Sequence, residues 1–199
     1  MLAGEMSHRV KNLFSIAIGL TEIASRSVAT PKEMVNDLTQ RLIALANAHE
    51  LVDPTLKDHR SAVSLDKLLA VLLGAYDDVG AVGDRIRVDV PLELRIGEGS
   101  ITTFALVVHE LATNSLKYGA LSRASGTLYV SCAVEDEEAV IVWAERGGPP
   151  VAAVRGEPGF GSKLVHRSIT RQLRGTIAFD WQPNGVRVTL RVSKSRLGV

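Results

Sequence analysis

The sequence predicts an α+β protein in which an N-terminal antiparallel helical hairpin precedes a two-layer α/β sandwich. Apolar residues recur at helical spacing through the first 51 residues. Later segments mix helical patterns with runs that alternate apolar and polar residues, and Gln182-Pro183-Asn184-Gly185 is typical of a turn between two strands. At 199 residues and 46% hydrophobic content, the chain has enough apolar material for a core and room for two small domains. We therefore expect helices on one face of a mixed sheet after the hairpin.

The hairpin is predicted from two helical segments, residues 2–25 and 31–51. Thr30 is expected to cap the second helix, with Pro31 at its first position and Glu33 in its first turn. Two helices cannot bury their wide apolar faces on each other alone. The simplest partner is a second copy of the chain, which predicts a four-helix bundle and a homodimer.

The second domain is expected to follow a polar linker that begins at Asp53-Pro54, so that the predicted domains are residues 1–57 and 58–199. Ser64 is expected to cap its first helix, and Ser100 or a neighbour the next one. A last helix, from about residue 162 to 173, is expected to end at Gly175. The predicted strands are residues 85–90, 127–135, 139–144, 176–181 and 186–192.

Composition excludes several classes of protein. The net charge of +1, with no basic stripe, argues against nucleic-acid binding. The single cysteine, Cys132, excludes an intrachain disulfide and a cysteine zinc site, and its strand-like surroundings predict a buried structural thiol. No apolar run is long enough to span a membrane and no signal peptide is evident, so the cytoplasm is the expected compartment. The cytoplasmic portion of a membrane-anchored receptor would have the same character.

The segment from residue 104 to 119 is predicted to be a helix that buries one side. Glu110, Asn114 and Lys117 recur at i, i+4 and i+7, which places a carboxylate, an amide oxygen and an ammonium on one stripe. These are the groups that a nucleotide phosphate site needs. On this segment alone, a solvated polar face is an equally good interpretation.

Four motifs occur in order along the chain: Ser7-His8-Arg9-Val10-Lys11-Asn12, the helix around Asn114, Trp143-Ala144-Glu145-Arg146-Gly147-Gly148-Pro149, and Gly159-Phe160-Gly161-Ser162. Together they resemble the sensor histidine kinases of two-component signalling, across essentially the whole chain. His109 and the W-x-E motif match the subfamily named for its His, Trp and Glu signature (HWE). The resemblance implies that the second domain has the ATP-binding fold shared by histidine kinases and chaperone ATPases (the Bergerat fold).

The resemblance implies that His8 is the phosphoacceptor. A neutral imidazole is nucleophilic near pH 7. Asn12, four residues further on, would orient that imidazole or a water that attacks a phosphorylated partner. Most histidine kinases have an acidic residue directly after the histidine, whereas this chain has Arg9. Glu110 as the base, or no base at all, are therefore both open.

In the Asn114 helix, the resemblance implies that Asn114 binds Mg²⁺ through its side-chain oxygen. Glu110 would hold a metal-bound water or accept a proton, and Lys117 would pair with the phosphates of ATP. Tyr118 would either cover the phosphates or pack in the protein. His109 would either hydrogen-bond within the lid of the site or be a satisfied buried histidine.

Glu145 ends a predicted strand, where related domains place an aspartate that accepts a hydrogen bond from the adenine amino group. Gly147 and Gly148 would let the backbone approach the base. Trp143 alternates with Glu145 onto the same strand face, where it would lie beneath the base or fill the core, and the core is favoured.

A second glycine box is expected to contact the phosphates through the amides at a helix N-terminus. It comprises Gly159, Phe160, Gly161 and Ser162. The loop from about Pro149 to Pro158 would be the ATP lid, with Arg155 as a further candidate phosphate contact.

The resemblance therefore implies an ATP- and Mg²⁺-dependent kinase that phosphorylates His8 and passes the phosphoryl group to an aspartate on the receiver domain of a bacterial response regulator. Phosphotransfer could take place within one chain or between the two chains of a dimer, and both possibilities are open. No sensor domain is evident in this sequence. One alternative is a phosphotransfer or scaffold protein that binds no nucleotide, although such a protein would be expected to lack the asparagine helix or a glycine box. Another is an ATPase or serine kinase of the same fold, which the His8 hairpin argues against.

Overall fold

The structure is a computed structural model that describes residues 21, 30–51, 62–77, 85–150 and 159–198. It divides into two compact units, Met1–Ala44 and Leu45–Val199. The first predicted helix, the linker and the predicted border after residue 57 lie outside the described residues. Among the described helices, none is both long and apolar enough to cross a membrane.

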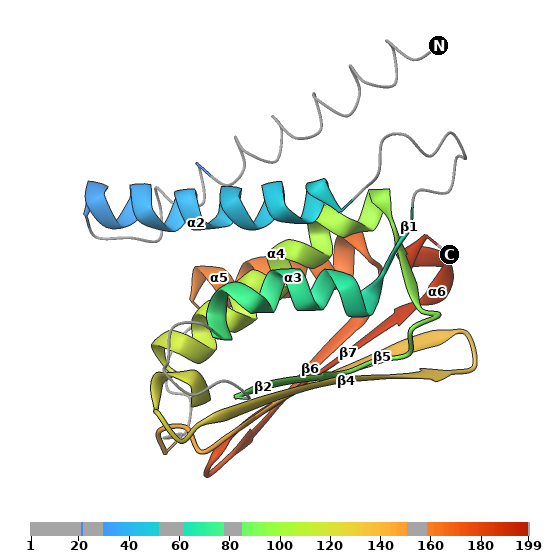
Figure 1. Cartoon of the computed structure of the whole chain (residues 1–199). Helices are drawn as coiled ribbons and strands as arrows, with labels where there is room; N and C mark the ends of the chain where they lie inside the picture. Colours follow the sequence, from blue (N-terminus) through green and yellow to red (C-terminus); the bar gives the residue numbers. More distant parts are fainter. Residues whose placement is uncertain (1–20, 22–29, 52–61, 78–84, 151–158, 199) are drawn as a thin grey trace. The chain divides into compact units, whose positions relative to one another are not determined.

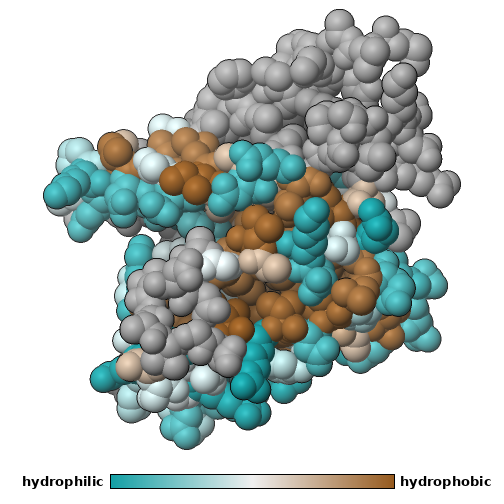
Figure 2. All heavy atoms as spheres, in the orientation of Figure 1, coloured by the Kyte–Doolittle hydropathy of each residue, from teal (hydrophilic) through white to brown (hydrophobic). Residues whose placement is uncertain are grey.

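The helix α2 (Pro31–Glu50) begins as its sequence predicts. The Glu33 amide donates to Thr30 Oγ1 (3.3 Å) and the Thr30 amide donates to Glu33 Oε2 (3.2 Å), which is a reciprocal capping box. Along the part of α2 that belongs to the first unit, large apolar side chains remain exposed to solvent (Figure 2). They are Val35, Leu42 and Ile43. This helix therefore carries an apolar stripe at i, i+7 and i+8.

A mixed five-stranded sheet forms one layer of the second unit, in the order β2-β4-β5-β7-β6. The parallel pair is β2 with β4, and every other neighbouring pair is antiparallel. The strands are β2 (Ile86–Asp89), β4 (Thr127–Glu135), β5 (Glu138–Arg146), β6 (Thr176–Gln182) and β7 (Gly185–Ser193). The predicted mixed sheet is confirmed. The structure also has a separate two-stranded sheet, which pairs β1 (Ala62–Ser64) with β3 (Arg95–Gly97).

Three helices form the other layer and lie on one face of the large sheet (Figure 1). They are α3 (Leu65–Asp77), α4 (Glu98–Lys117) and α5 (Phe160–Arg167). The core lies between the layers, because apolar side chains alternate along the strands toward the helices. Its largest fully buried side chains include Leu65, Leu68, Leu69, Ile101, Phe104, Leu128, Trp143, Ile169 and Leu190. The predicted two-layer sandwich is thus confirmed.

The middle of α4 is buried on all sides rather than on one. Every residue from 104 to 112 is buried, including His109 and Glu110. The prediction of one-sided burial was wrong because α3, α5 and the sheet all pack around this helix. Polar groups in such a position require hydrogen-bonding or charged partners.

The predicted cap of α4 was also wrong. The helix starts at Glu98 with Gly97 at the N-cap, and no side chain caps it. The Ser100 hydroxyl instead donates to the carbonyl of Arg196 (2.7 Å), in the C-terminal helix α6 (Lys194–Leu197). Ser100 therefore ties the start of α4 to the end of the chain.

The last long helix begins earlier than predicted and ends differently. α5 starts at Phe160 and continues as a π-helical turn over Ser168–Gln172. Arg174, with φ of 51°, adopts the left-handed conformation after the helix, instead of Gly175. Gly175 is required for another reason, since a Cβ there would lie 2.2 Å from the Arg191 carbonyl oxygen.

Candidate functional site

Glu145 lies near the end of β5 and is only 7% exposed. Its Oε1 accepts a hydrogen bond from the Trp143 indole (2.9 Å), and its Oε2 accepts one from the Ala120 backbone amide (2.7 Å). A carboxylate offers about four lone-pair sites, so it retains acceptor capacity after these two bonds. The carboxylate is therefore held in one orientation without being saturated.

The W-x-E motif acquires a structural explanation from this arrangement. Trp143 is 2% exposed, and it shares the helix-facing side of β5 with Glu145 because side chains alternate along a strand. Of the two interpretations of Trp143, the structure supports the core residue. The indole both fills the core and orients the neighbouring carboxylate.

Two glycines allow backbone segments to approach this carboxylate. A Cβ on Gly119 would lie 2.0 Å from Glu145 Oε2, and one on Gly148 would lie 3.0 Å from the Ala120 amide nitrogen. Gly147 adopts a φ of +75°, which glycine tolerates best, and its amide donates to the Asn184 carbonyl (3.0 Å). The turn after β5 and the end of α4 thus meet at Glu145.

Glu110 lies at the opposite end of the polar stripe and is 5% exposed. Its Oε2 faces the first turn of α5, since a Cβ on Gly161 would lie 2.4 Å from that oxygen. A helix N-terminus favours negative charge because its amides are directed outward. The structure therefore brings Glu110 together with the second glycine box, whose Gly159 is the N-cap and whose Ser162 is half-buried.

The polar stripe becomes more exposed toward the end of α4. Asn114 is half-buried one turn after Glu110, and Lys117 is exposed at the last helical residue. Tyr118 is 74% exposed, which rules against the interpretation that it packs in the protein. From Glu110 to Lys117 the helix rises about 10 Å. Along α4 these residues therefore lie between Glu110, which faces the start of α5, and the helix end, which meets Glu145.

His109 is a satisfied buried histidine. Its Nδ1 lies 2.5 Å from the hydroxyl of Tyr76, in the last turn of α3. Sequence reasoning did not single out Tyr76, because one tyrosine on an apolar helix is common and its partner lies 33 residues away. Its pairing depends on how α3 packs on α4.

Arg85 is a second residue that the sequence alone did not reveal. Its guanidinium donates to the carbonyls of Gly126 (3.0 Å), Leu121 (2.9 Å) and Arg123 (2.8 Å). This fork braces the turn that follows the short helix η1 (Ala120–Ser122). The Ala120 amide that binds Glu145 is thereby held in place.

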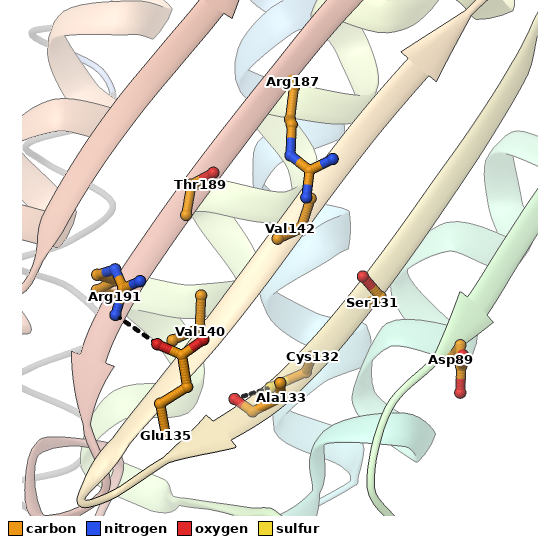
Figure 3. Close-up of a pocket in the computed structure, with 10 residues that line it drawn as sticks. All are labelled: Asp89, Ser131, Cys132, Ala133, Glu135, Val140, Val142, Arg187, Thr189 and Arg191. Atoms are coloured by element: carbon orange, nitrogen blue, oxygen red, sulfur yellow. Dashed lines mark hydrogen bonds and ion pairs between the residues drawn. The ribbon is translucent and has the colours of Figure 1, made fainter.

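The opposite face of the sheet carries a depression of about 490 Å³ that includes none of the predicted site residues. Figure 3 shows its lining side chains in front of the strands, with the helices behind. Arg191 forms ion pairs there with Glu135 (2.8 Å) and Glu138 (3.6 Å). Cys132, also at this depression, is half-buried, and burial raises its pKa to about 11. The thiol is thus protonated at neutral pH, as expected of a structural cysteine rather than a nucleophile.

Several predicted site residues lie outside the described residues. They are His8 and Asn12, with the rest of their motif, and the lid residues 151–158, including Arg155. The side chain of Phe160 is likewise not described. The described site therefore comprises α4, the end of β5 and the start of α5.

Known structures share this fold. The histidine kinase domain of the blue-light-activated histidine kinase EL346 from Erythrobacter litoralis superposes with a TM-score of 0.67 at 16% identity, covering 94% of this chain and 98% of that one. The catalytic domain of the histidine kinase ThkA gives a TM-score of 0.54 at 14% identity over 67% of this chain and 95% of that one. The fold is therefore that of a histidine kinase catalytic core.

Sequence comparison supports a family assignment. Residues 5–91 match the model of the HWE histidine kinases. Blue-light-activated histidine kinase 1 of Erythrobacter litoralis is 34% identical over 96% of this chain, and a blue-light-activated histidine kinase of Brucella anthropi is 28% identical over 94%. The family-model match and these relatives support an HWE-family histidine kinase catalytic core. The chain spans 53% and 37% of the lengths of these two relatives.

Proposed function

We propose that this chain is the catalytic core of an ATP-dependent protein histidine kinase. The observation that carries the proposal is the Glu145 carboxylate, which Trp143 and the Ala120 amide hold at the end of β5 with acceptor capacity to spare. A buried carboxylate of this kind suits the adenine amino group, which is a hydrogen-bond donor. Guanine carries an acceptor at the corresponding position, so the same carboxylate would select against it.

The remaining residues would bind the phosphates and the metal. Mg²⁺, when bound, would neutralise charge on the phosphates, and Asn114 supplies an amide oxygen of the type that it prefers. Among the described residues, no three His, Cys, Asp or Glu side chains are grouped to hold a metal by themselves. Mg²⁺ would therefore be held by the single amide oxygen of Asn114 together with phosphate oxygens and waters. Lys117 and the first turn of α5 would contact the phosphates.

The reaction would end on His8. Its imidazole nitrogen attacks the γ-phosphorus of ATP, the bond to the bridging oxygen breaks, and ADP leaves. Glu110 is available to accept a proton or to hold a metal-bound water. The phosphoryl group would then pass to an aspartate on a response regulator in the cytoplasm. In support of this partner class, a structure of ThkA in complex with the response regulator TrrA shares the fold, with a TM-score of 0.52 at 16% identity over 98% of this chain and 61% of that one.

Incubation with γ-³²P-ATP and Mg²⁺ tests the proposal. We expect acid-labile, alkali-stable labelling of the wild-type chain and none of His8→Ala, because phosphohistidine has that stability pattern whereas phosphoserine and phosphoaspartate do not. His166→Ala removes an exposed histidine from the last turn of α5 and serves as the matched control, which should label normally. Undiminished acid-labile label on His8→Ala would reject His8. No measurable ATP affinity in a titration with Mg²⁺ would favour the non-catalytic alternative.

A further inference from the structure

The hydroxyl of Tyr76 joins two helices beside the proposed kinase site. It lies 2.5 Å from His109 Nδ1, and the two rings are tilted by 57° with centroids 6.1 Å apart. Tyr76 belongs to α3 and His109 to α4, so the bond crosses the interface between these helices. Neither Tyr76 nor His109 belongs to the W-x-E motif or to the glycine boxes.

The hydroxyl of Tyr76 can donate its proton to Nδ1, and His109 then carries its own proton on Nε2. The side chain of Thr113 also forms a hydrogen bond with Tyr76. Burial is the largest influence on Tyr76 and raises its pKa overall, with a further contribution from the Glu110 carboxylate. The hydroxyl therefore keeps its proton at neutral pH.

The position of this link relates it to Glu110. His109 and Glu110 are consecutive and both 5% exposed, within the stretch of α4 that is buried on all sides. Rotation or sliding of α4 against α3 would break the bond between Tyr76 and His109. It would also displace Glu110 from Gly161 at the first turn of α5, and Asn114 with it. The hydrogen bond between Tyr76 and His109 is therefore made in the same arrangement of α4 in which Glu110 Oε2 faces the start of α5.

We infer that Tyr76 is a positioning residue of the kinase site, whose hydroxyl holds His109 in one orientation and tautomer and thereby places Glu110 and Asn114 opposite the start of α5. The inference rests on the proposed kinase function. Tyr76 acts through its neighbours and touches no substrate. Its role is to keep the α4 side chains aligned during phosphoryl transfer, since small displacements of catalytic groups have large effects on rate.

The kinetic test uses Tyr76→Phe in the full chain, which removes one hydroxyl and little volume. We expect the autophosphorylation kcat to fall by about tenfold, as for loss of one aligning hydrogen bond. The KM for ATP should change less than kcat, because Glu145 and its partners, which bind the adenine in the proposed function, are unaffected. Tyr129→Phe is the matched control. It removes the hydroxyl that donates to Asp89 (2.7 Å) on the exposed sheet face, and it should leave kcat unchanged.

A spectroscopic test reports on His109 directly. In ¹⁵N-histidine-labelled wild-type protein, we expect a pyridine-type shift at Nδ1 and a pyrrole-type shift at Nε2, whereas Tyr76→Phe should show a mixture of tautomers. Conservative rescue provides a second check. His109→Asn offers an acceptor near the place of Nδ1 and should retain more activity than His109→Leu, which offers none.

Two results would overturn the inference: wild-type kcat and an unchanged ¹⁵N pattern in Tyr76→Phe, or an equal loss of kcat in Tyr129→Phe. Either result, with a wild-type chain that labels on His8, rejects the role of Tyr76 and leaves the kinase proposal standing. If the wild-type chain does not label, the kinase proposal fails, and the kinetic role of Tyr76 is rejected as well. The ¹⁵N spectrum then separately confirms or rejects the control of His109 by Tyr76.

Discussion

A buried carboxylate with two protein donors is the central feature of this site at the scale of single residues. Glu145 accepts from an indole two residues earlier and from a backbone amide 25 residues earlier. The first partner is set by strand alternation and can be anticipated from the W-x-E spacing. The second requires the end of α4 to fold against β5, which no local pattern indicates.

Replacing Glu145 with Gln tests this arrangement. The amide has one oxygen and one NH₂ group, so either the Trp143 N–H or the Ala120 N–H must face another donor. We expect the free energy of unfolding to fall by about 1–3 kcal/mol, measured by denaturant titration, since a buried donor loses its partner. Binding of ATP should weaken as well, measured by calorimetry.

Glu138→Gln on the same strand is the control for charge removal. Glu138 is exposed and lies 3.6 Å from Arg191 in a surface ion pair. Its loss should change stability by no more than about 0.5 kcal/mol, because such pairs contribute little. Equal effects of the two substitutions would contradict a specific role for the Glu145 carboxylate.

At the scale of elements, α4 organises the site because it is the central helix of its layer. Its middle is enclosed by α3, α5 and the sheet, and its end turns sharply through Gly119 toward Ala120. No side chain fits at position 119, because Glu145 Oε2 occupies the space that a Cβ would fill. The helix end and the carboxylate are therefore mutually dependent.

Gly119→Ala should be destabilising for this reason. Its Cβ would lie 2.0 Å from Glu145 Oε2 and 2.9 Å from the Cα of Ser115, so the carboxylate must move and lose the Ala120 amide. We expect a loss of about 1–3 kcal/mol in the free energy of unfolding, together with weaker ATP binding.

The matched control is Gly74→Ala in α3, where a Cβ would meet nothing within 4 Å. Helix propensity favours alanine there, so this variant should be about 0.5–1 kcal/mol more stable than wild type. A Gly119→Ala protein as stable as Gly74→Ala would show that the contact with Glu145 can relax at no cost.

At the scale of the whole molecule, the exposed stripe of Val35, Leu42 and Ile43 on α2 supports the proposed homodimer. Large apolar side chains at i, i+7 and i+8 lie on one helix face and favour burial against another helix. A second copy of the predicted hairpin would offer a matching stripe and complete a four-helix bundle.

Light scattering tests the assembly, and we expect a particle of twice the mass of one chain. The double variant Val35→Glu/Leu42→Glu should be monomeric, because charged side chains would have to be buried at the interface. Gln40→Glu adds charge at another exposed position of α2 and should remain dimeric. A wild-type monomer at all concentrations would exclude the dimer.

The sequence by itself determined most of the elements and the composition of the site. Alternation and helical spacing are local consequences of backbone geometry, so the five strands of the large sheet, the capping box at Thr30 and the glycine boxes were predictable. The tertiary structure alone decided the burial of α4 on all sides, the role of Ser100 and the left-handed Arg174. It also supplied the partners Tyr76, Arg85 and Ala120, because hydrogen bonds across 25 to 41 residues depend on how helices pack on a sheet rather than on any periodicity along the chain.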